Sequence, residues 1–150
     1  MKTNYSNLLP EISLKLKKGK IEKITICNSS DCANLFRKIW DKDSLPIYES
    51  FIVIFLDRQN KSIGWLKISQ GGITGTVTDV RLIFSAALKC LATGLLIAHN
   101  HPSGNLRFSE TDDMITQKIK EAGKILDITL LDHIILTEES YFSFADNGNI

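Results

Sequence analysis

An uninterrupted apolar segment, SFIVIFLD at residues 50–57, restricts the possible folds of this chain more than any other feature. It is rich in β-branched and aromatic side chains, as is typical of a strand that is buried on both faces. LLIAH at residues 95–99 is a second, shorter segment of this kind. Such strands must be covered on both sides, so the sequence predicts a sheet with helices packed against it.

Three other segments have apolar residues at helical spacing, and each follows residues that can cap a helix. The first spans 29–40, and its cap candidates are Ser29, Ser30 and Asp31. The second is expected over 80–92, with Asp79 as its cap and Gly94 as its stop signal. The third begins at Ser109, and the residues on its apolar face are Ile115, Ile119, Ala122 and Leu126.

Shorter segments complete the expected sheet. Further strands are predicted at 11–17, 24–26, 62–69, 128–136 and 141–145. The polar stretch RQNK joins 50–57 to 62–69 as a hairpin, and the glycine-rich residues 70–76 form a loop. The alternation of strands and helices predicts an α/β or α+β fold, a mixed β-sheet flanked by helices in one globular unit. Residues 46–150 are expected to form its main part, which residues 1–45 extend with strands and a helix.

Composition excludes several classes of protein. The chain has 150 residues and a formal net charge of +1, so it lacks the strongly basic character of many nucleic-acid-binding domains. Its apolar runs stay below the ~18 residues of a membrane span, and MKTNYSNLLP does not resemble a secretory signal. We therefore expect a cytoplasmic protein. The three cysteines form no C-x-x-C pair, which indicates free thiols rather than a disulfide framework or a thiolate metal site.

The segment HNHPSGNLRFSETD at residues 99–112 carries the chemistry. In extended backbone, His99 and His101 point to the same side, so both imidazoles can face one point in space. Pro102 tends to end the strand there, and the loop that follows can return Asp112 to the histidines. Two histidines and a carboxylate leave a fourth zinc position open, as in catalytic zinc sites.

A structural interpretation of the same residues competes with the metal site. Ser109-Glu110-Thr111-Asp112 fits the capping box S-x-x-D, in which the aspartate side chain serves only the helix start. Two of the three histidines of the chain nevertheless lie in one H-x-H segment, before a proline and ahead of that carboxylate. This combination favours the metal site.

HNHPSG followed by SETD resembles the JAB/JAMM (MPN+) metalloprotease motif H-x-H-P-x6-S-x-x-D, and more closely the bacterial RadC family. LLDHIIL at 130–136 and GTVTDVRLIFSAAL at 75–88 are also similar to that family, over roughly residues 46–148. The resemblance implies a JAB/MPN-like, cytidine-deaminase-like fold with one zinc ion. It implies that the ion is bound by His99, His101 and Asp112.

The resemblance also implies catalytic residues. Ser109 matches the motif serine that stabilises the oxyanion, and Glu49, two residues before Phe51, matches the upstream glutamate that acts as general base. The implied activity is hydrolysis of a peptide or isopeptide bond, with a protein or peptide as substrate. Residues 1–45 do not resemble the helix-hairpin-helix module of longer RadC proteins, so a stand-alone catalytic domain or a short member of the mobile-element type is expected.

Two other functions compete with this hydrolase. A DNA-associated accessory protein of repair or mobile elements would use the metal site structurally or retain it as a vestige. A zinc-dependent deaminase also uses a glutamate, but the chain lacks the P-C-x-x-C ligand pair. Near the motif, Asn100 is expected to support the strand, and His133 to be a structural histidine. Asp132 is a candidate partner of a zinc histidine.

Overall fold

The computed structural model describes residues 10, 22–71 and 77–150. The strand predicted at 11–17 and most of the loop predicted at 70–76 lie outside these residues. The described part is an α+β fold with one five-stranded sheet and three helices, as the sequence predicts. No helix in it is both long enough and apolar enough to cross a membrane.

The sheet has the strand order β2-β1-β3-β4-β5. Its strands are β1 (Ser50–Leu56), β2 (Ser62–Gln70), β3 (Gly94–Asn100), β4 (Thr129–Leu136) and β5 (Tyr141–Ser143). β3 and β4 pair in parallel, and the other neighbours pair antiparallel, so the sheet is mixed. β1 and β2 form the predicted hairpin. The parallel pair is joined by a helical crossover, which such a pairing requires.

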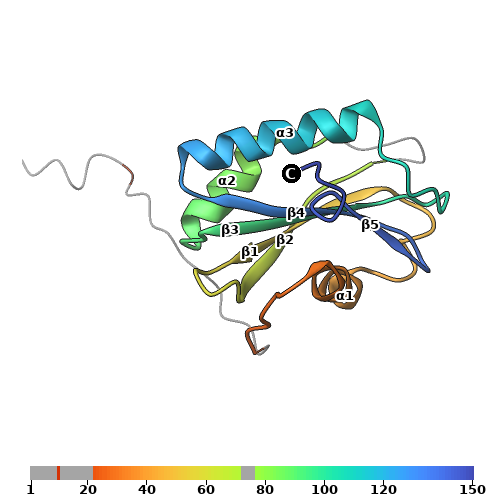
Figure 1. Ribbon diagram of the computed structural model, residues 1–150, viewed down its shortest axis with the longest axis horizontal. Coiled ribbons are helices and arrows are strands. Elements are labelled where there is room, and N and C mark those ends of the chain that lie inside the picture. Colours follow the sequence, from red (N-terminus) through yellow and green to blue (C-terminus); the bar gives the residue numbers. More distant parts are fainter. Residues whose placement is uncertain (1–9, 11–21, 72–76) are drawn as a thin grey trace, which may run out of the picture.

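Helices cover both faces of the sheet (Figure 1). Helix α1 (Ser29–Ile39) lies on one face, and α2 (Val80–Lys89) and α3 (Glu110–Ile125) lie on the other. Every residue of β1 and β3 is buried, which confirms the prediction from their apolar sequences. Alternate side chains of β1 therefore enter two separate cores, with Ile52 and Ile54 facing α1 and Phe51 and Val53 facing α2 and α3.

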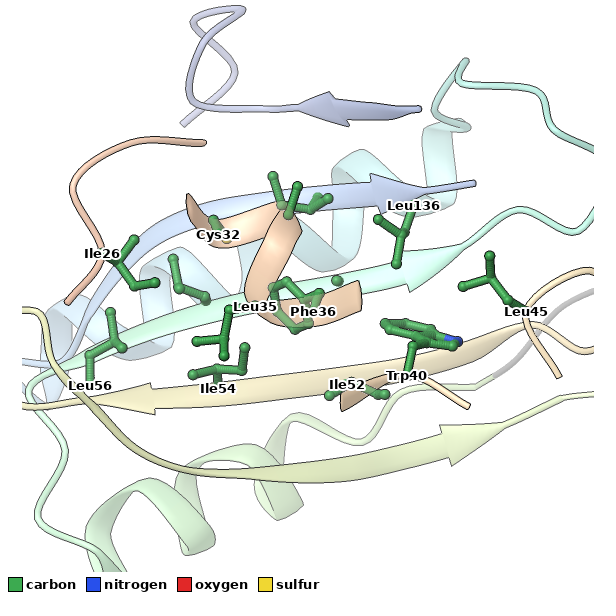
Figure 2. Packing of buried hydrophobic residues seen from close by; sticks show 14 residues of the cluster. Ile26, Cys32, Leu35, Phe36, Trp40, Leu45, Ile52, Ile54, Leu56 and Leu136 are labelled. Carbon is green, nitrogen blue, oxygen red and sulfur yellow. The ribbon is translucent and has the colours of Figure 1, made fainter. Parts of the chain in front are cut away.

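The core beneath α1 is built on aromatic side chains. Phe36 is fully buried, and its ring meets Trp40 edge to face at 6.3 Å between centroids. Both side chains point from the helix toward the strands (Figure 2). Arg37, on the same helix, donates to the carbonyl oxygens of Thr137, Glu138 and Ser140 at 2.7–2.9 Å. These bonds tie α1 to the turn between β4 and β5.

Two predictions for residues 24–31 need correction. The N-cap of α1 is Asn28, whose side chain accepts from the Asp31 N–H, rather than one of residues 29–31. Residues 24–26 form an isolated bridge, Thr25 to Lys61, and not a full strand. The three thiols, Cys27, Cys32 and Cys90, are free, as expected.

The end of α2 also differs from the prediction. The helix ends at Lys89, and Gly94 is the first residue of β3 rather than a helix stop. The reversal falls on Leu91, which has φ +57° and is 80% exposed. In α3, Leu126 is the C-cap and is exposed, so it does not share the apolar face with the buried Ile119.

We expect Leu91→Gly to stabilise the protein. A left-handed conformation costs a residue with a Cβ atom about 1–2 kcal/mol, more than the added chain entropy of glycine. Since Leu91 is exposed, the free energy of unfolding should rise by about 0.5–1 kcal/mol in urea titrations. Leu88→Gly, at an exposed position inside α2, should lower it by about 1 kcal/mol. Equal destabilisation by both changes would contradict this account.

Candidate metal centre

The two histidines of the H-x-H segment meet at the end of β3. His99 lies within the strand, and His101 follows it directly while its N–H still bonds to the carbonyl of Leu136 at 3.0 Å. Extended backbone thus continues through both residues and turns both imidazoles to the same side. Their Nε2 atoms are 2.9 Å apart.

Asp112 reaches this pair from the first turn of α3. Its Oδ1 is 3.2 Å from His99 Nε2, and its Oδ2 is 3.9 Å from His101 Nε2. Its Oδ2 also accepts from the N–H and hydroxyl of Ser109, and Ser109 Oγ accepts from the Asp112 N–H. The capping box and the histidine cluster therefore exist together, one on each side of a single carboxylate.

The donor set fits a metal ion. The ligand atoms of His99, His101 and Asp112 all lie within 4.8 Å of one another. Two ligands at zinc distances in a tetrahedral arrangement are roughly 3.3 Å apart, which is close to the separations of 2.9 and 3.2 Å that involve His99. Each imidazole has its Nδ1 against a group behind it, His133 Nε2 for His99 and the Asn105 carbonyl for His101, so both Nε2 atoms face the common point. The triad could therefore bind a metal ion.

Electrostatics favour an ionised carboxylate at this point. Burial alone would raise the pKa of Asp112, but the contacts with His99 and the hydrogen bonds from Ser109 together hold it well below its ordinary value. The position at the start of α3 also favours a negative charge. The side chains of His101 and Asp112 are 16% and 15% exposed against 2% for His99, so the cluster opens to solvent on one side.

Asn100 lies between the two histidines but points to the opposite face. It is fully buried, its Oδ1 accepts from the Ser50 N–H, and its Nδ2 donates to the carbonyls of Leu45 and Tyr48, all at 2.7 Å. These bonds fix the segment that leads into β1. Asn100 thus has the supporting role that the sequence predicts, and it holds the backbone on both sides of Glu49.

Glu49 lies directly before β1 and is half-buried. It lines a cleft of about 600 Å³ that also includes His101. The other residues lining this cleft are Pro46, Ile47, Pro102, Ser103, Asn105 and Arg107. The proposed base and one metal-ligand candidate therefore border the same cleft.

The structure corrects the expectation for Asp132 and gives His133 a contact that the sequence did not predict. Asp132 accepts from Ser143 Oγ at 2.6 Å and from the N–H groups of His133 and Ala145, so its carboxylate supports β5 and not a zinc histidine. Burial raises its pKa. His133 is buried with both ring nitrogens hydrogen-bonded, as expected of a structural histidine, and its Nε2 lies 2.8 Å from His99 Nδ1. Burial lowers the pKa of His133 well below its ordinary value.

One feature of the sequence could have pointed to His133: the chain has only three histidines, and the other two lie in the H-x-H segment. The contact itself depends on the register between β3 and β4, in which His133 stands beside Ile97. A register shift between Leu95 and Leu96 sets this alignment. The sequence pattern does not reveal that shift.

Comparison with known proteins identifies the family. Residues 26–149 match the family described as RadC-like JAB domain. The chain belongs to this family. The match begins earlier than residue 46 and so includes α1 of the RadC-like domain.

Proteins named UPF0758 are similar to this RadC-like chain. One from Flavobacterium johnsoniae is 49% identical over 129 residues, which cover 86% of this chain and 54% of the relative. One from Haemophilus ducreyi is 45% identical over 65% of this chain and 44% of its own length. One from Aquifex aeolicus is 34% identical over 93% and 58%. The chain thus spans about half the length of the curated relatives it matches.

We expect Asn100→Ala to destabilise the domain strongly. The change leaves the Ser50 N–H and the carbonyls of Leu45 and Tyr48 without their buried partner. The free energy of unfolding in urea should fall by about 2–4 kcal/mol. Asn147→Ala removes one partly buried side-chain bond, to the Ser143 carbonyl, and should cost about 1 kcal/mol or less. Comparable small losses in both variants would show that the Asn100 bonds do not hold this segment.

Proposed function

We propose that this chain is a zinc-dependent hydrolase of peptide or isopeptide bonds. The observation that carries the proposal is the convergence of His99, His101 and Asp112, with their ligand atoms within 4.8 Å of one another. Membership in the RadC-like JAB family supports the same chemistry. The proposed substrate is a protein or peptide.

The choice of zinc follows from the donor set. Two imidazole nitrogens and one carboxylate oxygen are ligands that zinc accepts, and three protein ligands leave a fourth position for water or substrate. When bound, a zinc ion makes water nucleophilic near neutral pH and polarises an amide carbonyl. The exposed side of the cluster, at His101 and Asp112, is where substrate enters.

Glu49 is the proposed general base. Its carboxylate borders the same cleft as His101, so it can take a proton from the attacking water and return it to the leaving amine. Asn100 keeps the Glu49 backbone in place through its bonds to Tyr48 and Ser50. A fixed backbone limits the positions that the Glu49 side chain can take, so less entropy is lost when its carboxylate accepts the proton in the transition state.

Ser109 is the proposed donor to the developing oxyanion. In the structure its hydroxyl donates to Asp112 Oδ2 at 2.8 Å. To act on substrate, the hydroxyl must exchange this bond for one to the oxyanion. The Ser109 N–H continues to hold the carboxylate during that exchange, because it donates to the same oxygen at 2.6 Å.

Zinc content tests the metal site directly. After reconstitution and removal of excess metal, we expect about one zinc per chain by plasma mass spectrometry. His99→Ala should lose it, because that change removes the most buried of the three ligands. Cys27→Ser removes an exposed thiol and should retain it. A metal-free wild-type protein after reconstitution would overturn the proposal.

Glu49→Gln separates catalysis from metal binding. We expect the variant to bind zinc like the wild type and to cleave at least about 100-fold more slowly, since general base catalysis contributes that much or more. The substrates are libraries of linear and isopeptide-linked peptides, with products read by mass spectrometry. Glu121→Gln, an exposed change in α3 beside Lys124, should retain full activity.

Activity that survives in Glu49→Gln would remove Glu49 from the mechanism. A wild type that binds zinc but cleaves no library member would favour the second function, a DNA-associated accessory protein with a structural metal site. That function predicts a salt-dependent mobility shift of DNA.

A further inference from the structure

A chain of buried hydrogen bonds runs behind the metal centre and returns to it. It links His99 Nδ1 to His133 Nε2 at 2.8 Å and His133 Nδ1 to Thr116 Oγ1 at 2.6 Å. Thr116 Oγ1 in turn donates to the carbonyl oxygen of Asp112 at 2.6 Å. His133 and Thr116 are fully buried, and His99 is 2% exposed. This series of hydrogen bonds therefore connects His99 on β3 with Asp112 on α3.

The proton positions along this chain can be deduced from Thr116. A hydroxyl has one proton, and that of Thr116 goes to the Asp112 carbonyl, which can only accept. Thr116 Oγ1 must then accept from its other partner, His133 Nδ1. His133 Nδ1 therefore carries a proton.

The same assignment of donors and acceptors gives the proton position on His99. The His133 ring is enclosed by Phe144, stacked at 4.5 Å, and Phe51 at 5.8 Å, an apolar surrounding that favours the neutral imidazole. A neutral ring with its proton on Nδ1 presents a lone pair at Nε2, so it accepts from His99 Nδ1. His99 in its neutral form then has a lone pair at Nε2, the atom that faces His101 and Asp112.

We propose that Thr116 and His133 are positioning residues that fix the tautomer and the ring orientation of His99 for metal binding. The proposal rests on the proposed zinc site and adds two residues outside the H-x-H…S-x-x-D motif. Histidine ligands of zinc commonly donate their second N–H to a carboxylate, carbonyl or water, and this partner sets the tautomer. Here the acceptor is another histidine, whose own tautomer is set by a threonine.

The arrangement also joins the two ligand-bearing elements. The hydroxyl that orients His133 is bonded to the main chain of Asp112, and Asp112 Oδ1 is 3.2 Å from His99 Nε2. Three hydrogen bonds thus join His99, His133, Thr116 and the main chain of Asp112. A metal ion shared by His99 Nε2 and Asp112 Oδ1 would close this arrangement into a circuit. A shift of α3 against β3 would break the hydrogen bonds through Thr116, so they fix the spacing between the two ligand-bearing elements.

Thr116→Val tests the circuit with little change in shape. Valine lacks the hydroxyl that holds His133 Nδ1, so zinc affinity, measured by competition with a chromogenic chelator, should fall about 10–100-fold. Thr116→Ser keeps a hydroxyl and should restore most of that affinity. Thr137→Val removes another buried hydroxyl, which bonds within the β4–β5 turn, and should leave zinc affinity unchanged. Wild-type affinity in Thr116→Val would overturn the proposal.

The histidine tautomers can also be measured directly on the wild-type protein. Long-range nitrogen–proton NMR correlations distinguish the two neutral histidine tautomers. We expect His133 to be protonated on Nδ1 in zinc-free and zinc-loaded protein alike, and His99 to be protonated on Nδ1 with Nε2 free for the metal in the zinc-loaded protein. A proton on His133 Nε2 would overturn the proposal even if zinc binds. A wild type that has the expected His133 tautomer but binds no zinc would refute the proposed function while leaving the hydrogen bonds in place.

Discussion

The pairing of β3 with strands on both of its sides is the constraint on which the candidate metal centre depends. β1 and β4 hold β3 in the middle of the sheet, and helices cover both of its faces. A strand fixed in this way directs alternate side chains to opposite faces. His99 is therefore turned toward α3, and Asn100 is turned toward the segment that carries Glu49. One strand end thus supports the ligands and the proposed base.

The beginning of α3 adds the third ligand candidate at little structural cost. The Asp112 carboxylate satisfies the N–H of Ser109 with one oxygen and approaches His99 with the other. The capping interaction already fixes the Asp112 side chain, so a metal ion bound there would cost less conformational entropy. The competing interpretation of this segment, a capping box alone, therefore accounts for one carboxylate oxygen of Asp112, and the contact with His99 accounts for the other.

Patterns local to the sequence predicted much of the fold and the candidate site. Apolar runs predicted β1 and β3, and alternation along an extended strand predicted that His99 and His101 face one point. What the sequence did not predict depends on contacts between distant segments. The His133 contact requires the β3–β4 register and its shift, and the reversal at Leu91 replaces a glycine signal with a strained leucine. The candidate role of Asp132 as partner of a zinc histidine is wrong for the same reason, because its carboxylate bonds to Ser143 and Ala145 instead.

The uneven exposure of the three ligand candidates has a kinetic consequence. His101 and Asp112 are partly accessible, whereas His99 is sealed behind them among aromatic rings. An ion that arrives from solvent meets the two outer groups first and completes its coordination on the inner imidazole last. Departure follows the reverse order, and an incoming chelator can attack only from the outer side. An ion held there would therefore exchange through the outer side, past His101 and Asp112, without opening of the core.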